Sequence, residues 1–143
     1  MVKRATSRRV DRSQASKYAA TGHVFLESAR ALAAVADEGA PYGNAIGLLS
    51  IHASISYTDA LTIAFGERKS AEEHGRAVDT LRTTLGSRLE DKQARMLRQI
   101  LLQKDAVSYQ GVFYSLEDGR RLLDKAESYC KWAREVFETR PTL

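Results

Sequence analysis

The sequence contains very few residues that interrupt a helix or cross-link the chain. Among its 143 residues are one cysteine, two prolines and nine glycines. A single cysteine, Cys130, excludes an internal disulfide framework and is typical of a protein in a reducing compartment. Because Cys130 lies among apolar residues, we interpret it as a small core residue. The scarcity of proline and glycine favours long helices over many short strands.

A long apolar segment is also absent. The longest weakly polar run, residues 45–64, is interrupted by His52, Asp59 and several hydroxyl side chains, so we do not expect it to span a membrane. The first residues are basic, but no apolar stretch follows them, so we expect no secretory signal. These features together predict a cytoplasmic protein that does not associate with membranes.

Positive charge is concentrated at the N-terminus. The net charge is +4, yet residues 1–17 hold six basic residues against one acidic residue, and the remaining chain is close to neutral. Residues 1–12 lack any apolar periodicity, and we expect them to form a disordered basic arm. Such an arm could contact nucleic-acid phosphates, or it could serve only as a solubilising tail.

Beyond the arm, apolar residues recur at intervals of three and four, as in amphipathic helices. The spacing predicts five helices, at about residues 13–37, 41–65, 70–86, 90–108 and 115–139. Capping-box patterns at residues 70–73 and 115–118 mark the starts of the third and fifth helices. No segment has a strand pattern and no repeat is visible. We therefore predict one all-α domain over residues 13–139, folded as an antiparallel up-and-down bundle.

Standard catalytic motifs are missing. The sequence has no phosphate-binding glycine loop, no Cys-x-x-Cys, no His-Glu-x-x-His and no nucleophile elbow. With only three histidines and no clustered ligands, it also predicts no metal site, and nothing in it calls for a cofactor.

Polar residues in the predicted helices are candidates for a site. His52 and Asp59 share one face of the second helix, where they form either a structural polar flank or a functional patch. Lys104, Asp105 and Tyr109 lie near the end of the fourth helix. Lys104 continues an apolar face, so it either extends its amino group to solvent or pairs with a carboxylate, for which Asp59 is a candidate. We group these five residues as a predicted polar cluster.

A second candidate is the pair Arg68 and His74, on either side of the link between the second and third helices. An arginine can hold a phosphate while a nearby histidine transfers a proton. At the start of a helix, the dipole disfavours the charged imidazole, which suits His74 to the role of a base. The alternative is a solvated connection with no chemical role.

A basic stripe lies on the predicted fourth helix. Its members, spaced by three and four residues, are Arg88, Lys92, Arg95 and Arg98. Such a stripe suits a nucleic-acid backbone, although it can also be only a solvated face. No aromatic residues are interleaved with it, as base stacking on a single strand would require.

The second-helix segment Ile51-His52-Ala53-Ser54-Ile55-Ser56-Tyr57-Thr58-Asp59-Ala60, followed by Gly66 and then His74, resembles the HEPN superfamily. The segment from Lys104 to Tyr109 and the alanine-rich last helix are similar to the same family. The resemblance extends over about residues 14–138 with a loose pattern. It implies a helical bundle that commonly forms a homodimer.

Known members of this superfamily are prokaryotic toxins, defence and RNA-processing nucleases, and non-catalytic partners of nucleotidyltransferases. Catalytic members carry Arg, four to six residues, then His, and cut RNA without metal; Arg68 and His74 match this spacing. The chain departs from the nuclease pattern at Lys69 and Arg76, where Asn and Tyr are frequent. The resemblance thus implies an RNA-binding or ribonuclease-type module, or a non-catalytic dimerising module, and leaves enzyme status open.

Overall fold

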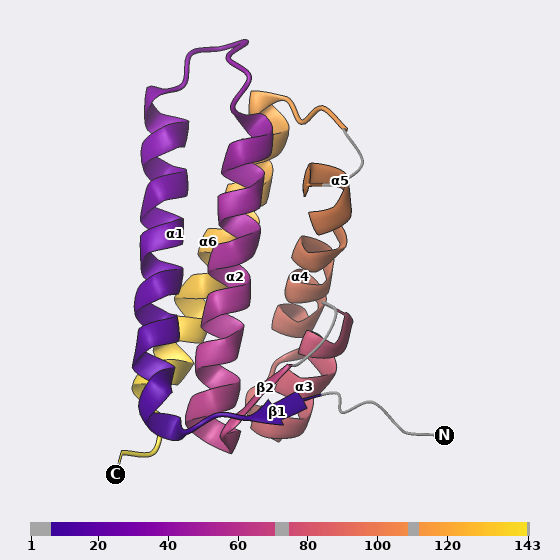
Figure 1. Ribbon diagram of the computed structural model, residues 1–143. Helices are drawn as coiled ribbons and strands as arrows, with labels where there is room; N and C mark the ends of the chain where they lie inside the picture. Colours follow the sequence, from indigo (N-terminus) through magenta and orange to yellow (C-terminus); the bar gives the residue numbers. More distant parts are fainter. Residues whose placement is uncertain (1–6, 71–74, 109–111, 143) are drawn as a thin grey trace.

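The computed structural model describes residues 7–70, 75–108 and 112–142, and it is mostly helical (Figure 1). Its helices are α1 (Ala15–Val35), α2 (Gly43–Gly66), α3 (Gly75–Leu85), α4 (Asp91–Leu102), α5 (Lys104–Ser108) and α6 (Leu116–Glu138). The all-α prediction is confirmed, although the predicted fourth helix is divided at Gln103 into α4 and α5. None of the helices in these ranges is both long and apolar enough to cross a membrane.

Helix α2 lies at the centre of the fold and packs against α1, α3 and α6. From Ser50 to Ala64, every residue except His52 and Ile55 is buried. The buried hydroxyls of Ser50, Ser54 and Thr58 each donate to a carbonyl oxygen one turn earlier in the helix. Because these groups bond within the helix, α2 is enclosed on several sides without leaving their hydroxyls unpaired.

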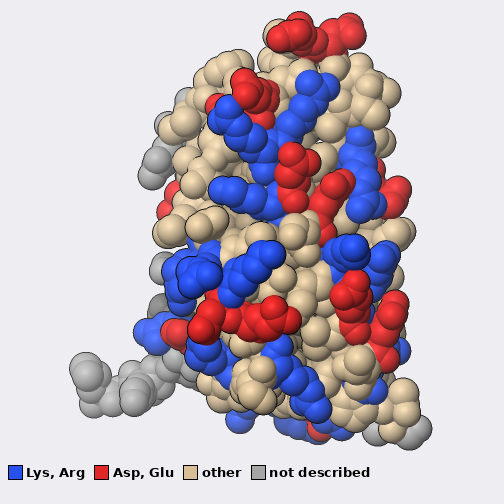
Figure 2. All heavy atoms as spheres, turned by 180° about the vertical axis from the view of Figure 1, so that it is seen from behind, with Lys and Arg blue, Asp and Glu red and all other residues tan. Residues whose placement is uncertain are grey.

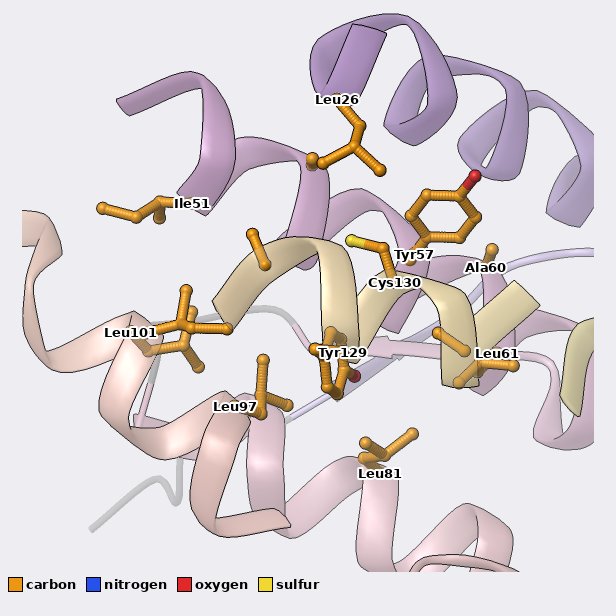
Figure 3. Packing of buried hydrophobic residues seen from close by; sticks show 14 of the residues in the cluster. Leu26, Ile51, Tyr57, Ala60, Leu61, Leu81, Leu97, Leu101, Tyr129 and Cys130 are labelled. Atoms are coloured by element: carbon orange, nitrogen blue, oxygen red, sulfur yellow. The ribbon is translucent and has the colours of Figure 1, made fainter. Parts of the chain in front are cut away.

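Helix α6 supplies much of the remaining core. Tyr129 is fully buried, and its hydroxyl lies 2.6 Å from Thr58 Oγ1 on α2. Figure 3 shows Tyr129 and Cys130 among leucines contributed by α1, α3 and α4. Cys130 is 1% exposed, which confirms that it is a core residue. The predicted capping box at the start of α6 is also confirmed, since the side chains of Ser115 and Asp118 bond reciprocally to each other's backbone amides.

The N-terminal arm is ordered over its described residues. Strand β1 (Ser7–Arg9) pairs antiparallel with β2 (Arg68–Ser70), and a 3-10 helix, η1 (Arg12–Gln14), leads into α1. Arg12 Nε donates to the Ala64 carbonyl oxygen at 2.7 Å, and the Val10 amide donates to the Glu67 carbonyl oxygen at 3.0 Å. The expectation of disorder is therefore wrong for residues 7–12, and the expectation of no strand is wrong for residues 7–9 and 68–70. Pairing with the chain beyond α2 satisfies the backbone groups of the arm.

Candidate functional site

The two paired strands form a ribbon at one end of the bundle (Figure 1). The two faces of this ribbon carry different side chains. Arg8 lies opposite Lys69, and residues opposite each other in an antiparallel pair share a face. This face approaches α2, since Lys69 Nζ lies 3.9 Å from Asp59 Oδ2. Side chains alternate along a strand, so Ser7 and Arg68 belong to the other face. There, Arg68 Nη1 donates to Ser7 Oγ at 3.4 Å.

Asp59 is a buried carboxylate beneath this ribbon. Burial raises its pKa to about 6, while the positive charges of Lys69 and Arg8 act in the opposite direction. The Lys69 amino group also lies 5.8 Å from the centre of the Tyr18 ring on α1. The ion pair therefore joins the ribbon to α2 but compensates only part of the cost of burying the charge.

The outer face of the ribbon borders a pocket of about 400 Å³, which we call the β2–α3 pocket. Its lining combines two guanidinium groups, one carboxylate and several hydroxyls, from Ser7, Gly66, Arg68, Arg76, Asp79, Thr80, Thr83 and Thr84. Arginine forks match the oxygens of phosphate and carboxylate groups, and hydroxyls add further donors. The pocket is therefore chemically suited to an anionic, oxygen-rich group.

Of the two residues predicted to act together in catalysis, the structure positions only Arg68, which lines this pocket. His74 lies outside the described residues, which end at Ser70 and resume at Gly75. Arg76, two positions beyond His74, lines the same pocket as Arg68. The sequence analysis noted Arg76 only as a departure from the nuclease pattern. Its position after a histidine and at the start of a helix is the signal that could have identified it.

The members of the predicted polar cluster that the structure describes do not assemble as one site. Asp59 forms its ion pair with Lys69, so the suggested Asp59–Lys104 pair is replaced by a contact with the ribbon. His52 packs against the Phe25 ring at 5.7 Å, and its pKa is lowered by burial and, to a lesser degree, by the nearby positive charge of Lys104.

The last two members of the predicted cluster are Asp105 and Tyr109. Asp105 is exposed on α5, and Tyr109 lies outside the described residues. His52 and Asp59 thus occupy two separate environments on α2, one beside α1 and one beneath the ribbon.

The basic stripe is present on the surface as expected. Arg88 belongs to a 3-10 helix, η2 (Gly86–Arg88), and Lys92, Arg95 and Arg98 lie on α4; all four are exposed. The Arg88 guanidinium also stacks over the Phe65 ring, 5.1 Å from its centre. The three α4 cations have no ion pair within the described part of the chain, so they present uncompensated positive charge to solvent.

Within the residues that the structure describes, no group of three or more histidine, cysteine, aspartate or glutamate side chains is arranged to hold a metal ion. Comparison with protein-family models, curated proteins and solved structures gave no match to this chain.

Proposed function

We propose that this chain is a HEPN-like RNA-binding module that holds an RNA phosphate in the β2–α3 pocket. One observation carries the proposal: Arg68 and Arg76 line the same pocket, beside the hydroxyls of Thr80, Thr83 and Thr84. The lining has two positively charged guanidinium groups and one negatively charged carboxylate, that of Asp79, so its net charge is positive. The exposed cations of α4 would add affinity for the RNA backbone that weakens with salt.

The proposed chemistry is metal-independent cleavage of RNA. His74, between Arg68 and Arg76 in sequence, would take the proton of a ribose 2′-hydroxyl. The 2′-oxygen would attack phosphorus while the arginines neutralise the phosphoryl oxygens. The bond to the 5′-oxygen would break, and that oxygen would take a proton from water. The products are a 2′,3′-cyclic phosphate and a 5′-hydroxyl.

The test separates binding from cleavage. Labelled RNAs are incubated in EDTA with the wild-type protein, His74→Ala and Arg68→Ala, and binding is measured by fluorescence anisotropy. Arg121→Ala is the control, because Arg121 is another exposed arginine, paired with Glu117 on α6. Cleavage lost in both site variants and kept in the control supports a nuclease. Binding without cleavage, weakened in Arg68→Ala, supports a non-catalytic RNA module, and a wild-type protein that neither binds nor cleaves overturns the proposal.

A second candidate is a non-catalytic module that forms a homodimer or binds a partner protein. Large apolar side chains are exposed at the end of the bundle away from the ribbon, at Tyr42, Leu102, Val112 and Phe113. Asn44, near Tyr42, accepts from the Tyr114 amide and donates to the Val112 carbonyl, so these segments lie together. Light scattering of the wild-type protein and of Phe113→Ser tests this idea. A wild-type monomer that captures no partner would remove it.

A further inference from the structure

The β2–α3 pocket contains one group that a phosphate cannot use, the carboxylate of Asp79. Arg68 and Arg76 supply guanidinium donors to the same pocket. The hydroxyls of Thr80 and Thr83 add further donors, since neither has a hydrogen bond to a described residue. A carboxylate only accepts hydrogen bonds, and its charge repels the oxygens of an anion. Asp79 is therefore suited to a ligand that carries hydrogen-bond donors beside its phosphate.

Asp79 is exposed and has no ion pair within the described part of the chain. Arg76 lies three residues before it on α3 and Arg82 three residues after it, a spacing that allows ion pairs on a helix. Arg82 instead lies 3.7 Å from Asp91 of α4, and Arg76 has no ion pair with a described residue. By contrast, Figure 2 shows acidic side chains interleaved with basic ones over one face of the molecule. The carboxylate of Asp79 is therefore available to a ligand in the pocket.

The spacing along α3 fits a ribose next to the bound phosphate. Residues three positions apart on an α-helix lie on the same side and about 4.5 Å apart along the axis. Asp79 thus lies beside Arg76 and further along the pocket, toward Thr83. In RNA, a ribose separates each phosphate from its base, and the ribose 2′-hydroxyl is a donor that DNA lacks. A phosphate held by the two arginines therefore brings a 2′-hydroxyl, rather than a base edge, within reach of Asp79.

We propose that Asp79 makes the β2–α3 pocket selective for RNA over DNA by accepting a hydrogen bond from a ribose 2′-hydroxyl. The inference rests on the function proposed above, because it requires a nucleic-acid phosphate on Arg68 and Arg76. That phosphate joins two riboses, and the 2′-oxygen of one of them attacks phosphorus in the proposed cleavage. Asp79 binds the other ribose, which is attached through its 5′-oxygen. It is thus a specificity-determining residue and transfers no proton.

The experiment compares matched single-stranded oligonucleotides by fluorescence anisotropy in EDTA. An RNA, its 2′-deoxy counterpart with uracil bases and its 2′-O-methyl counterpart have one sequence and differ only at the 2′-position. All proteins carry His74→Ala, so that a nuclease would leave the RNA intact. The RNA should bind about tenfold more tightly than either counterpart, because only the RNA has a 2′-donor for a charged acceptor.

Two variants of Asp79 test its role. Asp79→Ala should remove the preference for RNA, and Asp79→Asn should retain part of it, since the amide oxygen still accepts. The ratio of RNA to DNA affinity is the decisive readout, because loss of a negative charge by itself strengthens the binding of both by a similar factor. The control is Asp124→Ala, which removes an exposed carboxylate of α6 outside this pocket and should leave the ratio unchanged.

A preference for RNA that Asp79→Ala leaves unchanged overturns the inference, as does equal affinity for RNA and either counterpart. In both cases, weaker binding of RNA and DNA by Arg68→Ala would show that the proposed phosphate site itself stands. A protein that binds neither RNA nor DNA overturns the proposed function and this inference with it. Thermal melting confirms that each variant is folded.

Discussion

The amino group of Lys69 lies 3.9 Å from the carboxylate of Asp59, and this ion pair joins the ribbon to a buried stretch of α2. On the opposite face of the same strand, Arg68 reaches the β2–α3 pocket. Strand β2 therefore makes a structural contact through Lys69 on one face and presents Arg68, a candidate anion-binding residue, on the other.

Replacing Asp59 with Asn should stabilise the protein at neutral pH. The folded state raises the pKa of Asp59 to about 6 from an ordinary value of 3.8, so between these pH values it binds more protons than the unfolded state. Stability from this group is thus present below pH 4 and is lost as the pH rises through 6. At pH 7 the charged carboxylate costs on the order of 1–3 kcal/mol. Urea unfolding from pH 4 to 7 should show a flatter profile for Asp59→Asn, and lower stability of the variant at pH 7 would contradict this.

Thr58 and Tyr129 should be energetically coupled, because their hydroxyls lie 2.6 Å apart in the core. Thr58→Val leaves the fully buried Tyr129 hydroxyl without this partner and should cost about 1–3 kcal/mol. Tyr129→Phe should cost less, since Thr58 still donates to the Ser54 carbonyl. Denaturant unfolding of both single variants and of the double variant measures the coupling. Strict additivity of the three free energies would show that the bond contributes nothing.

The contact between the first turns of α2 and α6 should tolerate no added side chain. A Cβ at Gly43 would lie 2.2 Å from the carbonyl oxygens of Tyr114 and Ser115. Gly43→Ala should therefore destabilise by about 3 kcal/mol or more, as the backbones are forced apart. Gly47, in the same helix, is the matched control, because its nearest neighbour to a Cβ is a side-chain methyl at 3.4 Å. Equal melting temperatures for Gly43→Ala and Gly47→Ala would refute this packing.

Cys130 should be chemically inert in the folded protein. It is buried, and desolvation raises the pKa of its thiol to about 12, so almost no thiolate forms near pH 8. A thiol reagent such as Ellman's should react with less than one tenth of the protein over the time in which the denatured chain reacts fully. The native protein could instead react rapidly, at a rate that stabilising conditions do not slow. That result would contradict the burial of Cys130.

If the chain binds RNA, the α4 cations should contribute through electrostatics alone. Replacing Lys92, Arg95 and Arg98 together by Gln should weaken binding similarly for RNAs of different sequence. The slope of log affinity against log salt should fall by about 2, at roughly 0.7 per lost phosphate contact. The control is Arg121→Gln with Lys125→Gln, two exposed cations of α6. A slope unchanged by the triple variant would mean that the stripe is only a solvated surface.

Local sequence patterns were sufficient to predict the helices. Apolar spacing of three and four residues located α1, α2, α3 and α6, and it located α4 and α5 as one segment, because each helix must bury one face whatever it packs against. The capping box at Ser115 and the burial of Cys130 followed from the same local information. The break at Gln103 was missed, since the apolar pattern continues through it into α5.

The ribbon and the partners of Asp59 could not be found in this way. Strand β1 has three residues and gains its hydrogen bonds from β2, about sixty positions later, so neither segment carries an alternating pattern of its own. Asp59 pairs with Lys69 rather than Lys104, and Arg68 shares a pocket with Arg76, because the turn after α2 brings the chain back across the end of the bundle. Helix formation depends on near neighbours in sequence, whereas a polar site depends on which distant segments the packed core brings together.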